Sequence, residues 1–141
     1  MVDLLEAVDR AFPCVPGRKG RNLRYARNLL LGIAPLLNHP KSDNDVIEAL
    51  YRAGYTRNAF AWVRPFVRAY FYPRPGIKDA MRIILEEVKA RQVISEDELL
   101  LKTKLPKPLF FEALFRLIIE GKLRREVTSE DYVKLVCFVR S

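Results

Sequence analysis

Hydrophobic positions in the first half of the chain recur at helical spacing. Residues 3–12 place their apolar side chains on one face, and residues 21–38 carry a broader apolar face. Two further segments, 43–53 and 56–71, show the same spacing and are joined by a short turn. Apolar positions three and four residues apart predict amphipathic helices. The first half is therefore expected to be helical throughout.

The segment 43–71 predicts a helix-turn-helix. Asp43 or Asp45 can cap the first helix, Gly54 suits the left-handed residue that follows it, and Thr56 can cap the second helix. The second helix has an apolar stripe (Phe60, Val63, Val67, Tyr70) and an arginine stripe (Arg57, Ala61, Arg64, Arg68). A helix-turn-helix presents its second helix to the DNA major groove in this way. The alternative is a surface helix with solvated arginines.

The second half changes from helical spacing to alternation near its end. The expected elements are helices at 77–91, 95–101 and 108–121, an extended link at 92–94, and strands at 123–128 and 132–139. Ser95 and Glu98 form a capping box, Pro108 suits a first helical turn, and Gly121 suits a helix end.

The order helix, short strand, helix, turn, helix and two-stranded hairpin over residues 77–139 resembles the winged helix-turn-helix domains. The third helix ends in Glu-Gly-Lys-Leu at 120–123 and continues directly into a strand, similar to the Gly-x-Leu junction of that superfamily. Many winged helices bind duplex DNA through the third helix and the wing, and others bind proteins. The resemblance implies an exposed start of the third helix with Lys104, Lys107, Phe111, Glu112 and Phe115, and with Arg116 further along. It also implies a wing with Arg124, Arg125 and Lys134.

Two features of this second half depart from the DNA-binding pattern. The expected wing tip contains Glu130 and Asp131, which repel phosphates. The helix face that would meet the groove carries Phe111, Phe115 and Ile119, which are apolar. That face suits a protein surface, either the first half of the chain or a second copy. The second half is therefore expected to be a docking or dimerisation platform.

The charge distribution places the nucleic-acid contacts in the first half. Of a net charge of +8, residues 1–75 hold 12 Lys and Arg against 6 Asp and Glu, and residues 76–141 hold 13 against 11. An excess of positive charge favours a polyanionic partner. A stiff Pro-Arg-Pro-Gly linker at 73–76 separates a basic helix-turn-helix domain, 1–72, from a winged domain, 77–141.

Further cations precede the helix-turn-helix. The loop 13–21 holds two prolines, two glycines and three basic residues, and is either a phosphate-binding segment or a solvated connector. The arginines in the first turns of the next helix oppose its dipole, which suggests a role in binding. The expected DNA-binding set is Arg18, Lys19, Arg21, Arg24, Arg27, Arg57, Asn58, Arg64, Arg68, Lys104, Lys107, Arg124 and Arg125.

Aromatic residues accompany the arginines of the second helix, namely Trp62, Phe66 and the run 70–72. Aromatic rings beside arginines can stack on unpaired bases. Core packing is the favoured interpretation, because this half has no strand pattern for a single-strand-binding sheet.

Other chemistry is not indicated. Cys14, Cys137 and His39 match no metal-site spacing, and two separate buried thiols are expected, with a disulfide as the alternative. The chain has no phosphate-binding glycine loop and no nucleophile–base motif, so neither an enzyme nor a cofactor is expected. It shows no signal peptide and no apolar run of membrane-spanning length, so a cytoplasmic protein is expected. Its single glutamine and many Lys, Arg and Glu are typical of a thermophile.

Together these patterns predict a mainly α protein with a small β-hairpin wing, built as two helix-turn-helix units in tandem. The favoured function is sequence-specific binding of duplex DNA by a small, dimeric transcriptional regulator. The alternative is a winged-helix adaptor that binds proteins inside a larger nucleic-acid-processing or viral assembly.

Overall fold

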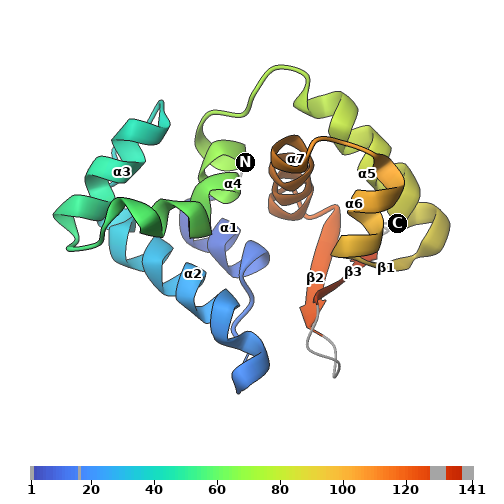
Figure 1. Ribbon diagram of the computed structural model, residues 1–141, viewed down its shortest axis with the longest axis horizontal. Coiled ribbons are helices and arrows are strands. Elements are labelled where there is room, and N and C mark those ends of the chain that lie inside the picture. Colours follow the sequence, from blue (N-terminus) through green and yellow to red (C-terminus); the bar gives the residue numbers. More distant parts are fainter. Residues whose placement is uncertain (1, 16, 128–132, 138–141) are drawn as a thin grey trace.

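The computed structural model describes residues 2–15, 17–127 and 133–137 (Figure 1). Its α-helices are α1 (Leu4–Ala11), α2 (Arg21–Ile33), α3 (Asp43–Arg52), α4 (Phe60–Phe71), α5 (Ile77–Arg91), α6 (Glu96–Thr103) and α7 (Lys107–Ile119). Short 3₁₀ helices are η1 (Arg18–Gly20), η2 (Ala34–Leu36) and η3 (Arg57–Ala59), and the strands are β1 (Val93–Ser95), β2 (Leu123–Val127) and β3 (Val133–Cys137). The prediction of a mainly helical protein is confirmed.

Side-chain caps fix the starts of two helices. The Asp3 carboxylate accepts a hydrogen bond from the Glu6 N–H (2.9 Å) at the start of α1. The Ser95 hydroxyl accepts one from the Glu98 N–H (3.2 Å) at the start of α6, as the Ser-x-x-Glu pattern predicts. The Glu98 carboxylate does not complete the box but pairs with Arg91 (2.8 Å), which ties the start of α6 to the end of α5.

The turn between α3 and α4 depends on Gly54, whose φ of 92° suits glycine. The Gly54 N–H donates to the Tyr51 carbonyl (3.0 Å), and the Tyr55 N–H donates to the Leu50 carbonyl (2.9 Å). These two bonds form a Schellman motif that satisfies the last carbonyls of α3, as predicted. Thr56 occupies the N-cap position of η3, which leads into α4, but its side chain makes no capping bond.

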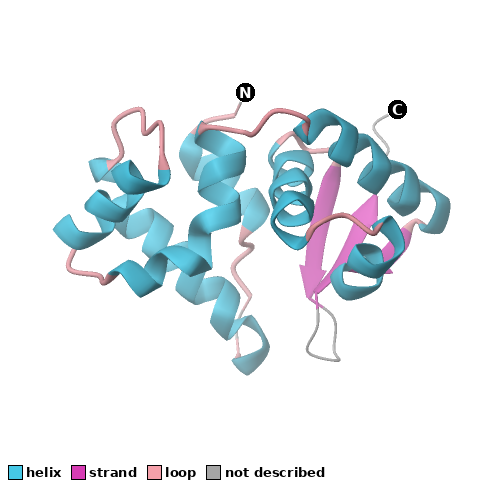
Figure 2. Ribbon diagram, turned by 45° about the horizontal axis from the view of Figure 1, so that its top comes forward, coloured by secondary structure: helices cyan, strands magenta, loops and turns pink. Residues whose placement is uncertain are grey.

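Strands β1, β3 and β2 form a three-stranded antiparallel sheet in that order (Figure 2). The hairpin register pairs Leu123 with Cys137, and β1 joins the other edge of β3 by pairing Val93 with Val136. The segment expected as an extended link before α6, at the place of the short strand of a winged helix, therefore supplies a third strand. The expected wing tip, with Glu130 and Asp131, lies outside the described residues.

The two halves of the chain meet at α7, which lies between α5 on one side and α4 and α1 on the other (Figure 1). Phe115 of α7 contacts Phe12 and Phe66, with ring centroids 5.4 and 6.2 Å apart. Phe115 and Ile119 are buried and Phe111 is half-buried. Of the two partners that the sequence allowed for this apolar face, the structure shows the first half of the chain. The core is continuous from one half to the other.

Arginines fasten the two halves together by capping helix ends. Arg10 of α1 donates to the carbonyl of Ile119 at the end of α7 (2.7 Å). Arg116 of α7 donates to the carbonyl of Ala69 near the end of α4 (2.9 Å). Arg125 of β2 similarly reaches the last carbonyl of α1 (2.8 Å). The last carbonyls of a helix lack partners within the helix, and the helix C-terminus carries partial negative charge. Each arginine therefore donates to a carbonyl that would otherwise lack a hydrogen bond at the interface.

Candidate nucleic-acid interface

Several arginines expected to contact DNA instead hold the fold together. Arg24 donates to the Val15 and Gly17 carbonyls (both 2.6 Å), which closes the loop before α2. Arg27 donates to the Phe12 carbonyl (3.1 Å) and pairs with Asp9 (2.5 Å), so it caps the end of α1. The expectation that these two arginines hold the DNA backbone is corrected. Arginines in the first turns of α2 thus satisfy carbonyls of the preceding segment, Arg24 in the loop and Arg27 at the end of α1.

Arg125 is likewise not a wing contact. Its guanidinium pairs with Glu96 (2.9 Å) and lies 4.9 Å from the centroid of the Phe115 ring. The Arg125 side chain is only 8% exposed. Arg125 is therefore part of the contact between the halves, because a guanidinium stacks on an aromatic face while its edge donates hydrogen bonds.

Arg68, expected on the outward stripe of α4, is turned toward two acids. It forms a bidentate pair with Asp43 (2.6 and 3.1 Å) and approaches Glu112 of α7 (3.4 Å). Asp43 also accepts a hydrogen bond from the Tyr72 hydroxyl (2.8 Å). The expectation that Arg68 meets base edges is thus corrected. Asp43 is not the helix cap either, since it is the first residue of α3 and Ser42 occupies the N-cap position. The Asp45 carboxylate instead accepts a hydrogen bond from the Lys41 N–H (2.8 Å) just before the helix.

Glu112 joins this cluster from the other half of the chain and is 2% exposed. Arg74 of the linker donates to both of its carboxylate oxygens (2.9 and 2.6 Å). The resemblance placed Glu112 on an exposed helix face, whereas the structure buries it between α7, α4 and the linker. The cluster holds the linker against both halves.

The hydrogen bond from Arg68 holds the pKa of Asp43 below its ordinary value of 3.8, against the opposing effect of burial. Burial, together with the hydrogen bond to Asp43, raises the pKa of Tyr72. The same ion pair raises the pKa of Arg68. The Asp43 carboxylate and the Arg68 guanidinium are therefore both charged at neutral pH.

Replacing Asp43 by Asn removes the ion pair with Arg68 and should lower the free energy of unfolding at neutral pH. The expected loss is about 1–2 kcal/mol, since solvent partly screens this pair. A carboxyl group whose pKa is lowered on folding stabilises the protein above its unfolded pKa and loses that effect as pH falls through the folded pKa. The difference between wild type and Asp43→Asn should therefore be constant down to about pH 5 and shrink below about pH 4. Urea unfolding at several pH values measures it, and an unchanged difference in acid would contradict the assignment.

The outward face of η3 and α4 carries fewer of the predicted DNA-binding residues than expected. Arg57, Asn58 and Arg64 are exposed, and the Arg64 guanidinium lies 5.5 Å from the centroid of the Phe60 ring. These residues line a hollow of about 560 Å³ together with Ser42, Asp43 and Asn44 at the start of α3 and with Arg68. Within the described part of the chain, neither Arg57 nor Arg64 forms an ion pair. We call Arg57, Asn58 and Arg64 the α4 basic face.

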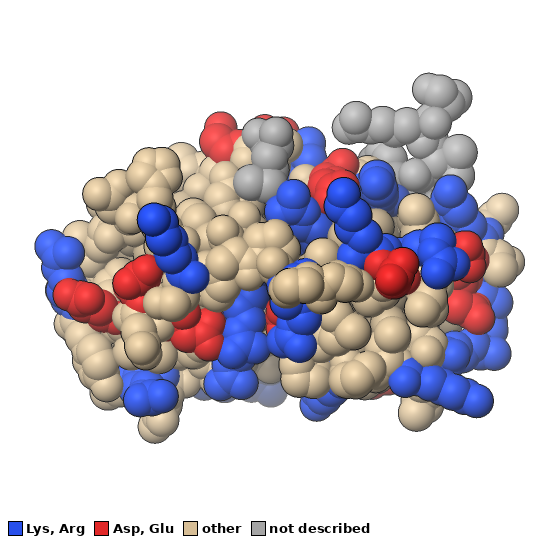
Figure 3. All heavy atoms as spheres, turned by 90° about the horizontal axis from the view of Figure 1, so that it is seen from above, with Lys and Arg blue, Asp and Glu red and all other residues tan. Residues whose placement is uncertain are grey.

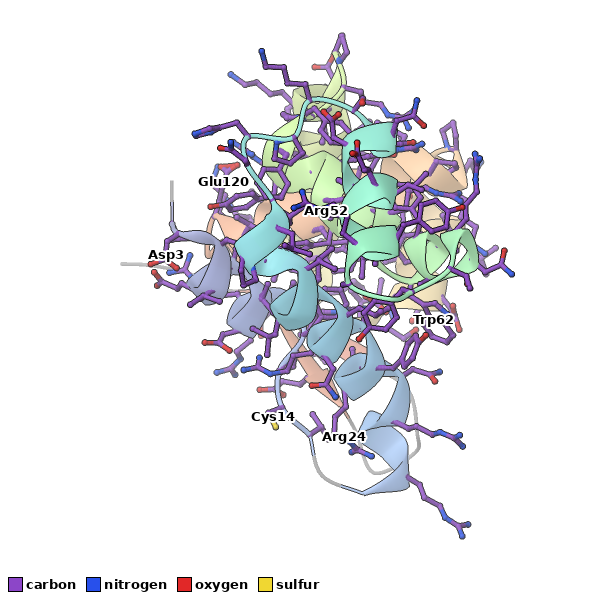
Figure 4. All side chains as sticks on the ribbon, turned by 90° about the vertical axis from the view of Figure 1, so that its left-hand side faces the viewer. Asp3, Cys14, Arg24, Arg52, Trp62 and Glu120 are labelled. Atoms are coloured by element: carbon purple, nitrogen blue, oxygen red, sulfur yellow. The ribbon has the colours of Figure 1, made fainter. Side chains whose placement is uncertain are left out.

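The start of α2 adds exposed cations. Arg18 and Arg21 are exposed and form no ion pair with any described residue, and the Lys19 side chain lies outside the described part. A second hollow, of about 590 Å³, lies between α2 and α4 and is lined by Arg21, Asn22, Arg24, Tyr25, Asn28 and Trp62. Figure 4 shows Trp62 at the surface and Arg24 turned toward the loop that carries Cys14.

The sequence-based assignment missed Tyr25 and placed Trp62 in the core. Both rings are about half exposed, at 43% and 46%, and they pack edge to face with centroids 5.0 Å apart. The signal in the sequence was the spacing of Arg21, Tyr25 and Asn28, which places an aromatic ring on the polar stripe of α2. The other aromatics, Phe66 and the run 70–72, are buried or half-buried as expected.

The remaining predicted cations lie in the second half and do not join this surface. Lys104 and Lys107 are exposed at the junction of α6 and α7, and Arg124 pairs with Glu126 (2.6 Å). The upper face of the molecule carries basic and acidic side chains interspersed over both halves, without a single-sign field (Figure 3).

Other chemistry is sparse among residues 2–15, 17–127 and 133–137. They contain no cluster of three or more His, Cys, Asp and Glu side chains placed to hold a metal ion. No helix in this part has the length and apolar character needed to cross a membrane. Cys14 is an exposed free thiol, contrary to the expectation that it is buried, and the Cys137 side chain lies outside the described part.

Comparison with known proteins adds no assignment to this geometry. No protein-family model, curated protein or solved structure matches the chain.

Proposed function

We propose that the protein binds duplex DNA through the α4 basic face. The observation that supports this proposal most directly is the position of Arg57, Asn58 and Arg64. Arg57 and Asn58 are exposed on η3 and Arg64 is exposed on α4, the second helical segment of the predicted helix-turn-helix. Neither arginine forms an ion pair with a described residue, although Asp43 lines the same hollow and has its pKa lowered mainly by Arg68 and to a smaller extent by Arg64. In this motif the first residues of the second helix contact base edges.

The side chains of this face match the chemistry of base recognition. Arginine donates two hydrogen bonds to the O6 and N7 atoms of guanine, and asparagine pairs with the N6 and N7 atoms of adenine. Arg18 and Arg21, at the start of α2, are placed to contact phosphates, which orient a protein on the duplex without reading its sequence. Sequence-specific binding and the role of a small transcriptional regulator both remain predictions.

The second half is proposed to be a winged-helix unit that serves as a platform. Its element order, α5-β1-α6-α7-β2-β3, supports that assignment. The face of α7 that would enter a major groove is covered by α1 and α4, so this helix has no free recognition face. The apolar residues that suggested a homodimer are used within one chain, and a dimer therefore has no support from that face.

Replacing both Arg57 and Arg64 by Ala should weaken binding to duplex DNA at least about tenfold at moderate salt. Each lost phosphate contact also lowers the slope of log affinity against log salt by about one unit, so two contacts lower it by about two. Fluorescence anisotropy with a labelled random duplex of about 20 base pairs, over a salt series, measures both quantities. Arg68 is left intact because its loss would disturb the ion pair with Asp43.

The matched control removes the same charge elsewhere. Arg82 and Arg91 are exposed arginines of α5, in the other half of the chain. Changing both to Ala should leave the affinity within about twofold, since neither lies near the α4 basic face. Equal losses for the two double variants would show that binding follows net charge alone and would refute the assigned face.

The adaptor function remains as a second proposal because a different surface favours it. A groove of about 590 Å³ lies between α5 and α7, with Ile77, Met81, Leu85 and Leu117 in its lining. Basic side chains at its edge, including Lys78 and Lys89, suit an acidic amphipathic helix of a partner protein. If the wild-type protein retains no duplex at low salt, this groove becomes the better candidate for the functional surface.

A further inference from the structure

The Tyr25–Trp62 pair is unusual in leaving two large aromatic rings half exposed beside each other. Tyr25 comes from α2 and Trp62 from α4, so the pair spans two helices of the first half. Exposed rings of this size leave apolar area in water that burial would stabilise. Other aromatics of the first half, such as Phe60 and Phe66, are buried. The pair therefore forms a surface suited to a flat ligand.

The lining of the adjoining hollow restricts the chemistry of that ligand. It contains two guanidinium groups and two side-chain amides, from Arg21, Arg24, Asn22 and Asn28, and no acidic residue. A cationic ligand is disfavoured by like charge, although aromatic rings alone could bind one. A ligand that combines an aromatic plane, hydrogen-bonding edges and negative charge fits every group present. A nucleotide within a nucleic-acid strand has these properties.

The roles within the hollow can be separated by the contacts already described. Arg24 donates to two loop carbonyls, so it holds the wall of the hollow. Arg21 is exposed and forms no ion pair with any described residue, and can meet a phosphate. Trp62 lies one helical turn from Asn58 of the α4 basic face.

We infer that the Tyr25–Trp62 pair stacks on an unpaired base, so that the preferred ligand is a duplex with an adjoining single strand. This inference rests on the proposed binding of duplex DNA by the α4 basic face and extends it to a duplex–single-strand junction. Aromatic stacking on unpaired bases is favourable for any base, and a paired base cannot offer its face to a side chain.

Trp62 is the single tryptophan of the chain, so its fluorescence reports directly on this site. The experiment titrates the full protein with a blunt duplex of about 20 base pairs and with the same duplex carrying a single-stranded overhang. The overhang should quench Trp62 emission and strengthen binding about tenfold over the blunt duplex, as expected for one or two stacked bases. Equal affinities with no added quenching would overturn the inference, while duplex binding itself would stand.

Variants test the ratio of the affinity for the overhang duplex to the affinity for the blunt duplex, measured by anisotropy of the labelled DNA. Trp62→Leu and Tyr25→Leu should bring the ratio of overhang to blunt affinity close to one, and Trp62→Phe should restore most of it. Tyr51→Leu changes a tyrosine of α3 that is 57% exposed and outside the hollow, and should keep the wild-type ratio. A wild-type ratio in Trp62→Leu would also refute the inference. Failure of the wild type to bind either duplex would instead refute the proposed function.

Discussion

Replacing Phe115 by Ala should lower the free energy of unfolding by about 3–5 kcal/mol, the range for removing a buried aromatic side chain. Phe115 is 5% exposed and contacts Phe12 and Phe66 from the other half of the chain. The Arg125 guanidinium also lies 4.9 Å from its ring centroid. Truncation would leave a cavity where α7 meets α1 and α4, and would remove the surface on which Arg125 stacks. Urea unfolding followed by circular dichroism measures the loss.

Phe111 provides the matched control, because it has the same side chain on the same helix but is only half-buried. Phe111→Ala should cost about 1 kcal/mol, since less apolar area is lost from the core. If Phe115→Ala does not fold, Phe115→Leu should fold with a loss of about 1–1.5 kcal/mol. Similar losses for the two alanine variants would contradict the packing of α7 between the two halves.

Glu112→Gln should destabilise the protein by about 2–3 kcal/mol, because it leaves two guanidinium groups facing an amide. The carboxylate accepts hydrogen bonds from both Arg74 and Arg68 and is almost fully buried. In glutamine one acceptor becomes an N–H donor that points at a cation. The loss in free energy of unfolding should be smaller than for breaking a fully buried ion pair, because the Arg74 side chain is 40% exposed.

The comparison variant is Glu86→Gln, which removes an exposed carboxylate 3.6 Å from Arg82 on α5. Its expected cost is below about 0.5 kcal/mol, as is usual for a solvent-exposed pair within one helix. Combining Glu112→Gln with Arg74→Met should cost less than the sum of the single changes, because the two residues share one interaction. Strict additivity would show that Glu112 acts through packing rather than through the ion pair.

The secondary structure followed closely from local patterns. The apolar spacing of residues 77–91 predicted α5 with the bounds that the structure shows, and Ser95 and Gly54 marked a helix start and a helix end. These features depend on residues within one or two turns of each other, so the local sequence is enough to predict them. The third strand, β1, was expected as an extended link from its residues and as a short strand only from the winged-helix resemblance, because a strand of three residues has too short a pattern to identify by itself.

The assignment of the basic residues was less successful, for a physical reason. Arg27, Arg68 and Arg125 have the same charge and a similar place in the pattern as Arg57 and Arg64. Their partners are a helix-end carbonyl, or a carboxylate, contributed by another segment. Arginine satisfies such groups as readily as it binds phosphate, and only the packing of distant elements shows which role applies.

The sequence by itself determined the helices, the Ser95 cap, the glycine turn and the apolar face of α7, because these depend on neighbours along the chain. Tertiary structure alone decided that α7 is covered by the first half, that Glu112 is buried between two arginines, and that Tyr25 and Trp62 meet at the surface. Each of these depends on which segments come together. The sequence shows that an apolar face or a cation requires a partner of a certain chemistry. The fold determines whether another segment of the same chain supplies that partner.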